Sequence, residues 1–319
     1  MRIKGGPVRV DRRPERRPGH TVVVSDTAIH PELRSVARFV PRKLIYGWSL
    51  PVLRRLTGLQ RVNNDGVELL TLPSGVGVRL YRPAGTPAAT PALLWIHGGG
   101  YVVGTAAQDD VLCRRFVKTL GITVASVDYR LAPEYPYPTP LEDCYTALTW
   151  LAGLPGVDGD RIAIGGASAG GGLAAALALL ARDRAELTPV FQVLVYPMLN
   201  DRTVGRHLDD PGHRLWNATS NRFGWTSYLR GADPDAAVPG RRTDLAGLPP
   251  AWVGVGTLDL FHDEDLDYAA RLQAAGVPCE VHVVPGAFHG FDGVAPKADI
   301  SREFFDSHCA SMRQYLTQA

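Results

Sequence analysis

Short apolar runs and longer amphipathic stretches alternate along most of this chain. The apolar runs have the length and composition of buried strands and fall near residues 92–96, 122–128, 161–165, 190–196, 251–255 and 279–284. Stretches with helical periodicity fall near 107–120, 140–152, 169–183, 264–275 and 299–316. This alternation predicts an α/β fold, with a parallel sheet covered by helices on both faces. The earlier segment 75–82 predicts an antiparallel opening strand.

Two regions depart from the alternation. Residues 31–58 carry apolar side chains at helical spacing before the first strand, and two interpretations stay open for them. They form either a helical cap over a site or a helix packed on the outside of the sheet. Residues 199–247 are polar and aromatic, with Trp216 and Trp225 among them, and lack a strand pattern. Because open α/β sheets carry their sites beyond the carboxyl ends of the strands, we predict that 199–247 forms the second half of a cap.

The charge of the chain is small overall but unevenly distributed. The 319 residues are 45% hydrophobic and 21% charged, an ordinary globular composition, and the formal net charge of +2 argues against a nucleic-acid partner. Residues 1–61 hold 14 Lys and Arg against 4 Asp and Glu, a net charge of +10. Residues 1–24 look irregular, and the basic run Arg12–Pro18 predicts a solvated, poorly ordered arm.

The absence of targeting patterns and the spacing of the cysteines bear on the cellular location of the protein and on the state of its thiols. The chain has no run of 18 apolar residues, which predicts no membrane span, and its first residues lack the apolar core of a secretory signal. These features favour a cytoplasmic location. The four cysteines, Cys113, Cys144, Cys279 and Cys309, lack metal or disulfide spacing and are interpreted as reduced, mostly buried thiols.

Ser168 is the first candidate for chemistry. It stands in Gly166-Ala-Ser-Ala-Gly170, directly after the strand pattern 161–165 and before an Ala/Leu-rich helix pattern. A serine on such a tight strand–turn–helix connection points its hydroxyl out of the sheet, and the glycines allow strand and helix to come close. The alternative for this motif alone is an ordinary glycine-rich turn.

The loop His97-Gly-Gly-Gly100 follows the strand pattern 92–96. Three glycines leave backbone N–H groups unobstructed, so they can turn toward the negative oxygen that develops during acyl transfer. The alternative is a flexible turn. His97 itself is interpreted as fixing this loop.

A reactive serine needs a base, and His289 is the favoured one of nine histidines. It lies in Gly286-Ala-Phe-His-Gly290, after the last strand pattern, at the same predicted edge of the sheet as Ser168. The alternative is a structural loop histidine, and His282 is interpreted as a packed or edge side chain.

The base in turn needs a carboxylate, and four candidates follow the strand pattern 251–255. Asp259 stands at the end of that strand. The other three, Asp263, Glu264 and Asp265, begin a helix, where acidic side chains suit the positive end of the helix dipole. The order Ser168, Asp259, His289 is that of the α/β-hydrolases.

These motifs give the chain a resemblance to the hormone-sensitive-lipase-like branch of the α/β-hydrolases, the bacterial family IV esterases, from about residue 65 onward. The resemblance is carried by His97-Gly-Gly-Gly100, Asp128-Tyr-Arg-Leu-Ala-Pro-Glu134, Gly166-Ala-Ser-Ala-Gly170, Gly247-Leu-Pro-Pro250 and His289-Gly-Phe291. It implies an α/β-hydrolase fold with a mostly parallel sheet of about eight strands, helices on both faces and a helical cap. The domain division it implies is an arm with cap helices in 1–60 and a catalytic domain in 61–319, with the cap insertion at about 199–247.

The resemblance also implies roles for individual residues. Ser168 would be the nucleophile, His289 the base and Asp259 the acid, with an oxyanion hole from the N–H groups of Gly99, Gly100 and Ala169. Tyr129–Pro138 would be a structural turn, and homodimers are common in such enzymes. Two positions depart from the family pattern: Ala167, where the common subgroups carry Asp or Thr, and Leu260-Phe261, where Pro-Leu is familiar.

The resulting prediction is a serine carboxylesterase that acts on short to medium acyl esters through an acyl-enzyme, with no metal or cofactor and a small-molecule ester as its partner. Three alternatives stay open. One is a serine hydrolase of amides, lactones or peptides. The second is a non-catalytic binding protein on the same fold, although such relatives have lost the histidine that is present here as His289. The third is a lipase acting at an oil interface, for which no lid with a long apolar face is evident.

Overall fold

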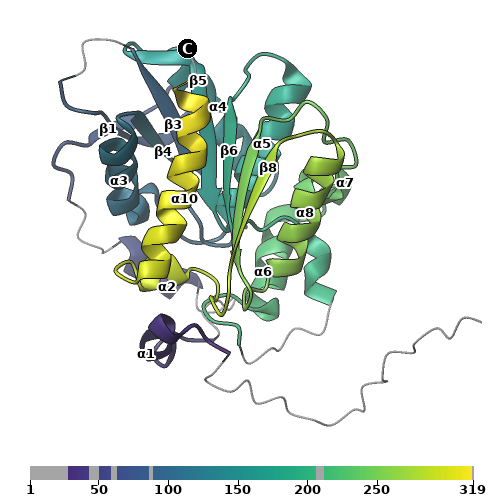
Figure 1. The fold of residues 1–319 in the computed structure, drawn as a ribbon. Coiled ribbons are helices and arrows are strands. Elements are labelled where there is room, and N and C mark those ends of the chain that lie inside the picture. Colours follow the sequence, from purple (N-terminus) through teal and green to yellow (C-terminus); the bar gives the residue numbers. More distant parts are fainter. Residues whose placement is uncertain (1–27, 43–49, 59–62, 86–88, 206–211, 318–319) are drawn as a thin grey trace, which may run out of the picture.

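One mostly parallel sheet organises the protein (Figure 1). The computed structural model describes residues 28–42, 50–58, 63–85, 89–205 and 212–317. Within these residues eight strands pair in the order β1-β2-β4-β3-β5-β6-β7-β8. The strands are β1 Glu68–Thr71, β2 Gly77–Tyr81, β3 Thr90–Ile96, β4 Thr123–Asp128, β5 Val157–Ala167, β6 Phe191–Val195, β7 Ala251–Gly256 and β8 Cys279–Val284. β2 runs antiparallel to β1 and β4, and all pairs from β4 to β8 are parallel, which confirms the predicted α/β architecture.

β1 and the length of β5 differ from the sequence prediction. β1 was not predicted because its four residues are mostly exposed and carry no apolar alternation. It forms through backbone pairing with β2, in the register Leu69 opposite Arg79. β5 begins at Val157, earlier than the predicted strand. The prediction missed this beginning because residues 158–160 are polar or glycine and half-buried or exposed, whereas the second half of β5 is buried.

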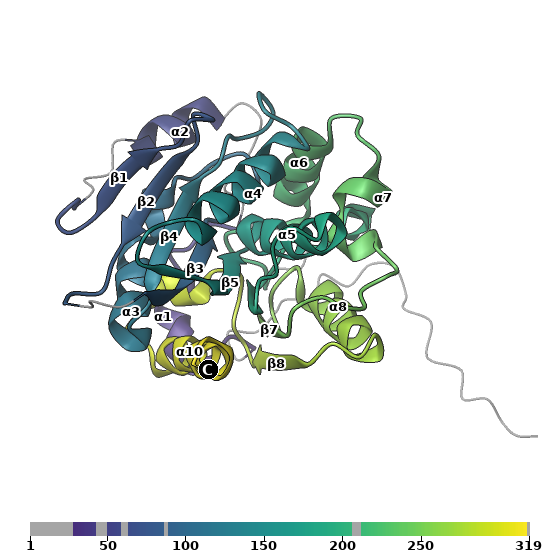
Figure 2. The ribbon, with the colours of Figure 1, turned by 90° about the horizontal axis from the view of Figure 1, so that it is seen from above.

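Two helical layers cover the sheet (Figure 2). The helices that cover it are α3 Asp110–Leu120, α4 Thr139–Ala152, α5 Ala169–Arg184, α8 His262–Ala274 and α10 Asp299–Leu316. Alternate side chains of β3 point to opposite faces: Leu94 and Ile96 join a core with α4, α5 and α8, while Leu93 and Trp95 join a core with α3 and α10. The prediction of helices on both faces is therefore confirmed.

The remaining short elements are η1 Pro31–Leu33, α1 Arg34–Ala37, α2 Leu50–Gly58, η2 Ala106–Asp109, η3 Asp201–Gly205, α6 Ala218–Leu229, α7 Pro234–Ala237, η4 Pro239–Arg241 and α9 Phe291–Val294. Figure 1 shows α1, α2 and α6 at the end of the sheet where the parallel strands stop. The N-terminal helical segment and the insertion therefore lie at the same end of the sheet. The predicted basic arm, Arg12–Pro18, falls outside the described residues.

Two findings bear on the earlier expectations about membranes and cysteines. No helix in the described part of the chain has the length and apolar character needed to cross a membrane. All four cysteines are free thiols, with Cys113, Cys144 and Cys309 buried and Cys279 half-buried.

Candidate active site

Ser168 stands at a sharp turn between β5 and α5. Its backbone has φ +57° and ψ −120°, a conformation that L-residues rarely adopt. Gly170 permits the turn, because a Cβ there would lie 2.6 Å from the carbonyl oxygen of His97. The backbone of Ser168 is fixed on both sides: its N–H donates to Val195 O, and its carbonyl accepts from Met198 N–H, both at 2.9 Å. The hydroxyl is thus presented by a rigid turn at the end of the sheet.

Three residues from separate strand ends meet at this turn. The distance from Ser168 Oγ to His289 Nε2 is 2.9 Å, and His289 Nδ1 lies 2.8 Å from Asp259 Oδ2. The other carboxyl oxygen of Asp259 accepts the N–H of Phe261 at 3.0 Å. All three side chains are buried. A carboxylate accepts hydrogen bonds only, so His289 carries its proton on Nδ1 and leaves Nε2 free to accept the hydrogen of Ser168.

Aromatic rings enclose the imidazole of His289. Tyr196 and Phe261 meet it edge-on, with ring centroids 4.8 and 5.2 Å away. The indole of Trp216, from the insertion, lies 6.4 Å from it. The packing holds the imidazole on several sides. Sequence reasoning missed Tyr196 and Trp216 as neighbours of His289, because nothing local in the sequence links either residue to it.

The glycine loop lies beside Ser168. Gly99 and Gly100 have φ values of +126° and +59°. Among the hydrogen bonds of the described residues, none is donated by the backbone N–H of Gly99, Gly100 or Ala169. A Cβ on Gly100 would lie 2.7 Å from Cζ3 of Trp216, so only glycine fits under this indole. The loop therefore offers unpaired N–H donors next to a buried aromatic wall.

His97 supports the loop from inside the protein. Its Nδ1–H donates to the carbonyl of Gly98 at 2.8 Å, and its ring stacks on Tyr129 at 4.3 Å. Tyr129 in turn donates its hydroxyl hydrogen to His97 O at 3.0 Å. Burial lowers the pKa of His97, so the ring is neutral and acts as a fixed donor rather than as a charge. These bonds hold the start of the glycine loop.

The three acidic residues after Asp259 lie in the first turn of α8, as predicted. The carboxylate of Asp263 is exposed and pairs with His262. Glu264 and Asp265 are buried, and Glu264 has a further role that the prediction did not include. Glu264 accepts the N–H groups of Leu199 and Asn200 at 2.7 and 3.1 Å, and burial raises its pKa to about 8. It therefore fixes the start of the insertion, a role that sequence position alone could not reveal.

Two hydrogen bonds join the N-terminal segment to the insertion. The N–H of Leu215 donates to Pro41 O at 2.9 Å, and the side-chain amide of Asn217 donates to Arg42 O at 2.7 Å. On α2, the guanidinium of Arg54 donates to Val102 O at 2.8 Å, just beyond the glycine loop. The N-terminal segment is thus hydrogen-bonded to the insertion through Pro41 and Arg42, and to the end of the glycine loop through Arg54.

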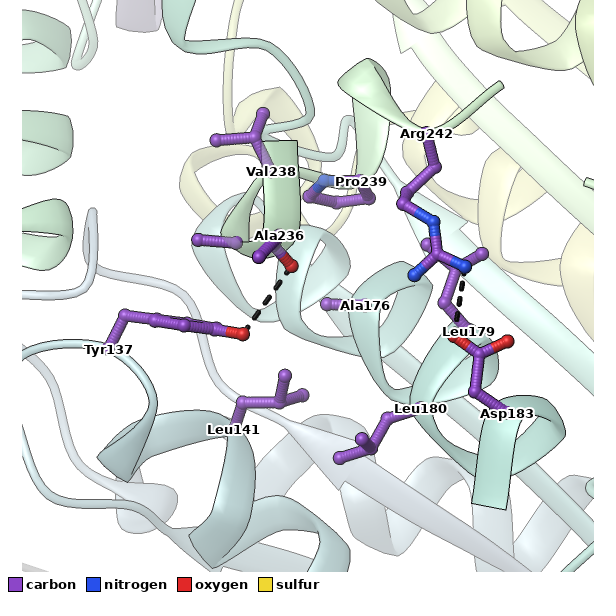
Figure 3. Close-up of a pocket in the computed structure, with 11 residues that line it drawn as sticks. Tyr137, Leu141, Ala176, Leu179, Leu180, Asp183, Ala236, Val238, Pro239 and Arg242 are labelled. Atoms are coloured by element: carbon purple, nitrogen blue, oxygen red, sulfur yellow. Dashed lines mark hydrogen bonds and ion pairs between the residues drawn. The ribbon is translucent and has the colours of Figure 1, made fainter. Parts of the chain in front are cut away.

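A separate cavity of about 240 Å³ lies between α4, α5 and the segment that contains α7 and η4 (Figure 3). Its walls are mainly aliphatic, with Leu141, Leu179 and Val238 among them. At its rim the guanidinium of Arg242 donates to Asp183 Oδ2 at 2.8 Å. No member of the Ser168 cluster lines this cavity, so the hydrogen-bonded geometry, rather than the cavity, identifies the candidate site.

Comparison with known proteins adds a family context. A family model described as alpha/beta hydrolase fold matches residues 93–293. Esterase LipI of Mycobacterium tuberculosis is 35% identical over 306 residues, which cover 91% of this chain and 96% of the relative. Ethyl acetate hydrolase of Pseudomonas putida is 37% identical over 241 residues, with coverage of 69% and 71%. The solved structure of a bacterial heroin esterase superposes with a TM-score of 0.83 at 37% identity, covering 92% of this chain and 99% of that one.

Proposed function

The chain belongs to the hormone-sensitive-lipase-like branch of the α/β-hydrolase family, and we propose that it hydrolyses carboxylic esters through a Ser168, His289 and Asp259 triad. Its relatives named above are esterases, so the chain is a carboxylic ester hydrolase. The proposal concerns the residues and the chemistry by which it works. The observation that supports this proposal is the pair of hydrogen bonds that links Ser168 Oγ to the imidazole of His289 and the imidazole to Asp259.

In the first half of the reaction, Ser168 Oγ attacks the ester carbonyl while His289 Nε2 takes the hydroxyl proton. Asp259 keeps the second imidazole nitrogen protonated and stabilises the imidazolium that forms. The carbonyl oxygen becomes negative and accepts hydrogen bonds from the N–H groups of Gly99, Gly100 and Ala169. One such donor typically contributes about 3 kcal/mol to the lowering of the barrier.

In the second half, the tetrahedral intermediate collapses and the C–O bond to the alcohol breaks. His289 returns its proton to the leaving alkoxide, and an acyl group remains on Ser168. Water then attacks this acyl-enzyme while His289 Nε2 takes one of the water protons. His289 passes that proton to Ser168 Oγ as the bond between Oγ and the acyl carbon breaks, which releases the carboxylic acid and restores the serine hydroxyl. All atoms come from the ester, one water molecule and the chain.

We propose that residues 31–58 and 199–247 form the cap over this site, and that the substrates are short to medium acyl esters. The indole of Trp216 and the ring of Tyr196 lie close to the imidazole of His289, and we expect them to limit the room for acyl chains. The names of the relatives, ethyl acetate hydrolase and heroin esterase, fit compact acyl groups. A preference for amides or lactones over simple esters stays the second candidate, because the same triad attacks those carbonyls.

The test of this proposal combines one variant with a substrate panel. Ser168→Ala should abolish turnover of a chromogenic short-chain ester, because the variant has no nucleophile, while its circular dichroism matches the wild type. Matched esters, amides and lactones measured on the wild type then separate the two candidate functions. Ester turnover at the wild-type rate in Ser168→Ala would refute the triad, and faster cleavage of the amides would favour the second candidate.

A further inference from the structure

Tyr196 occupies a strained position directly after β6. Its φ is +35°, a conformation unfavourable for a residue with a side chain, and its N–H donates to Gly254 O at 2.7 Å. Such strain persists only where the surroundings enforce it, and it concentrates at functional sites. The backbone around Tyr196 is also the part of the chain that fixes the nucleophile, since Val195 and Met198 hold the two sides of Ser168.

The side chain of Tyr196 reaches the loop that carries the base. Its ring meets the His289 ring edge-on at 4.8 Å, with an angle of 63° between the planes. Its hydroxyl donates to Asp292 Oδ1 at 2.8 Å. Asp292 lies three residues after His289, on α9. The side chain of Tyr196 therefore connects the strand end that fixes Ser168 with the loop that carries His289. Its ring also contacts the imidazole of His289.

Two buried acidic side chains, Asp292 and Asp109, lie near the contact between Tyr196 and His289. Burial raises the pKa of Asp292, while the hydrogen bond from Tyr196 and the proximity of His289 oppose that rise. Asp109, whose Oδ2 accepts the indole N–H of Trp95 at 2.8 Å, interacts electrostatically with Asp292, and burial raises the pKa of Asp109 to about 7. Asp259 accepts the Nδ1–H of the same imidazole. The hydroxyl of Tyr196 therefore gives the buried carboxyl group of Asp292 a hydrogen-bond donor, although other acidic side chains lie nearby.

We propose that Tyr196, tethered to Asp292, is a positioning residue that holds the imidazole of His289 in line with Ser168. The inference rests on the proposed function, because it assigns a part in the same proton transfer. Tyr196 acts through the histidine and forms no bond with the substrate. The alternative is that the pair only stabilises the fold, as an ordinary buried hydrogen bond does.

The variants Tyr196→Phe and Asp292→Asn test the tether, with Tyr145→Phe as the matched control. Tyr145 and Tyr196 are both 7% exposed, and Tyr145 likewise donates to a carboxylate, Glu186, but on α4 away from the site. We expect Tyr196→Phe to lower kcat at least about tenfold with KM little changed, because a small displacement of the base weakens proton transfer more than binding. The control should keep wild-type kcat.

Two further readouts separate positioning from stability. The double variant Tyr196→Phe/Asp292→Asn should lose no more kcat than the more damaged single variant, because both changes break the same tether. The low-field proton NMR resonance of His289 Nδ1 should move in Tyr196→Phe and stay in place in Tyr145→Phe. If Tyr196→Phe fails to fold, the same kcat and resonance measurements on Asp292→Asn decide the question.

The outcomes distinguish the inference from the function on which it rests. Turnover that depends on Ser168 but is unchanged in Tyr196→Phe, with an unmoved resonance, would overturn the positioning role alone. Additive losses of kcat in the double variant would equally overturn the tether. Turnover that survives Ser168→Ala would remove the proposed triad and the inference together.

Discussion

The substitution Asp259→Asn tests the candidate site by changing which nitrogen of His289 carries the proton. The two carboxyl oxygens of Asp259 have different partners: Oδ1 accepts the N–H of Phe261 at 3.0 Å, and Oδ2 faces His289 Nδ1 at 2.8 Å. An asparagine in the same place keeps its carbonyl oxygen toward Phe261, since the reverse orientation sets two donors face to face. The amide NH₂ then points at the imidazole. His289 must accept at Nδ1 and carry its proton on Nε2, where it can no longer take the proton of Ser168.

The expected loss is large because the wrong tautomer is enforced by the backbone. Exchanging the amide orientation would leave the buried N–H of Phe261 without an acceptor, at a cost of about 1–3 kcal/mol. With the base blocked in this way, we expect kcat to fall about 10⁴-fold, which corresponds to about 5.5 kcal/mol in the activation free energy. KM should change little, because Asp259 is separated from the substrate by the imidazole.

The assay is steady-state hydrolysis of a chromogenic acetate ester near neutral pH, with circular dichroism to verify folding. Asp263→Asn is the control, because its carboxylate is exposed, pairs with His262 and lies only four residues further along the chain, in the first turn of α8. The control should keep wild-type kcat. A value of kcat within tenfold of the wild type in a folded Asp259→Asn protein would refute the assignment of the acid.

Two further predictions concern stability and the glycine loop. Because the pKa of Glu264 is raised from 4.5 to about 8 in the folded state, the folded protein binds this proton more tightly, so the contribution of Glu264 to stability is fully present below about pH 4.5 and is lost as the pH rises through 8. Glu264→Gln keeps an acceptor for Leu199 and Asn200 and should flatten this fall in urea unfolding at pH 5 and 9; an unchanged difference between the two pH values would contradict it. Gly100→Ala should reduce stability by about 1–3 kcal/mol and lower kcat, because its Cβ meets Trp216 and its φ is +59°. Gly121→Ala, at φ +68° with open space around it, adds strain without a clash and should keep wild-type kcat; equal activity of the two variants would count against the role of the loop.

The sequence predicted the parallel sheet and the convergence of Ser168, Asp259 and His289, because each residue lies within a few positions of the end of a predicted strand. Parallel strands end at the same edge of the sheet, so residues at their carboxyl ends converge without any knowledge of loop shape. β1 was missed for the opposite reason: its pairing with β2 uses backbone groups, which leave little trace in an exposed four-residue segment.

The contacts around His289 were not predictable in the same way. Tyr196 looks like the last residue of an apolar strand, and its partner Asp292 is 96 positions away, so neither residue marks the other. Glu264 looks like a helix-start carboxylate, and only the course of the insertion brings the N–H groups of Leu199 and Asn200 to it. Such links depend on where long connections return to the sheet, which hydrophobic patterning does not encode.

The position of β8 at the edge of the sheet has a consequence for how the enzyme regains activity after denaturation. His289 follows β8, which pairs with β7 at the C-terminal side, whereas Ser168 follows β5 in the interior of the sheet. With His289 as the proposed base, a refolding chain hydrolyses no ester until β8 has paired with β7, even when the central strands are already folded. Recovery of turnover therefore reports the pairing of this edge strand, and it should not precede signals that report folding of the central strands.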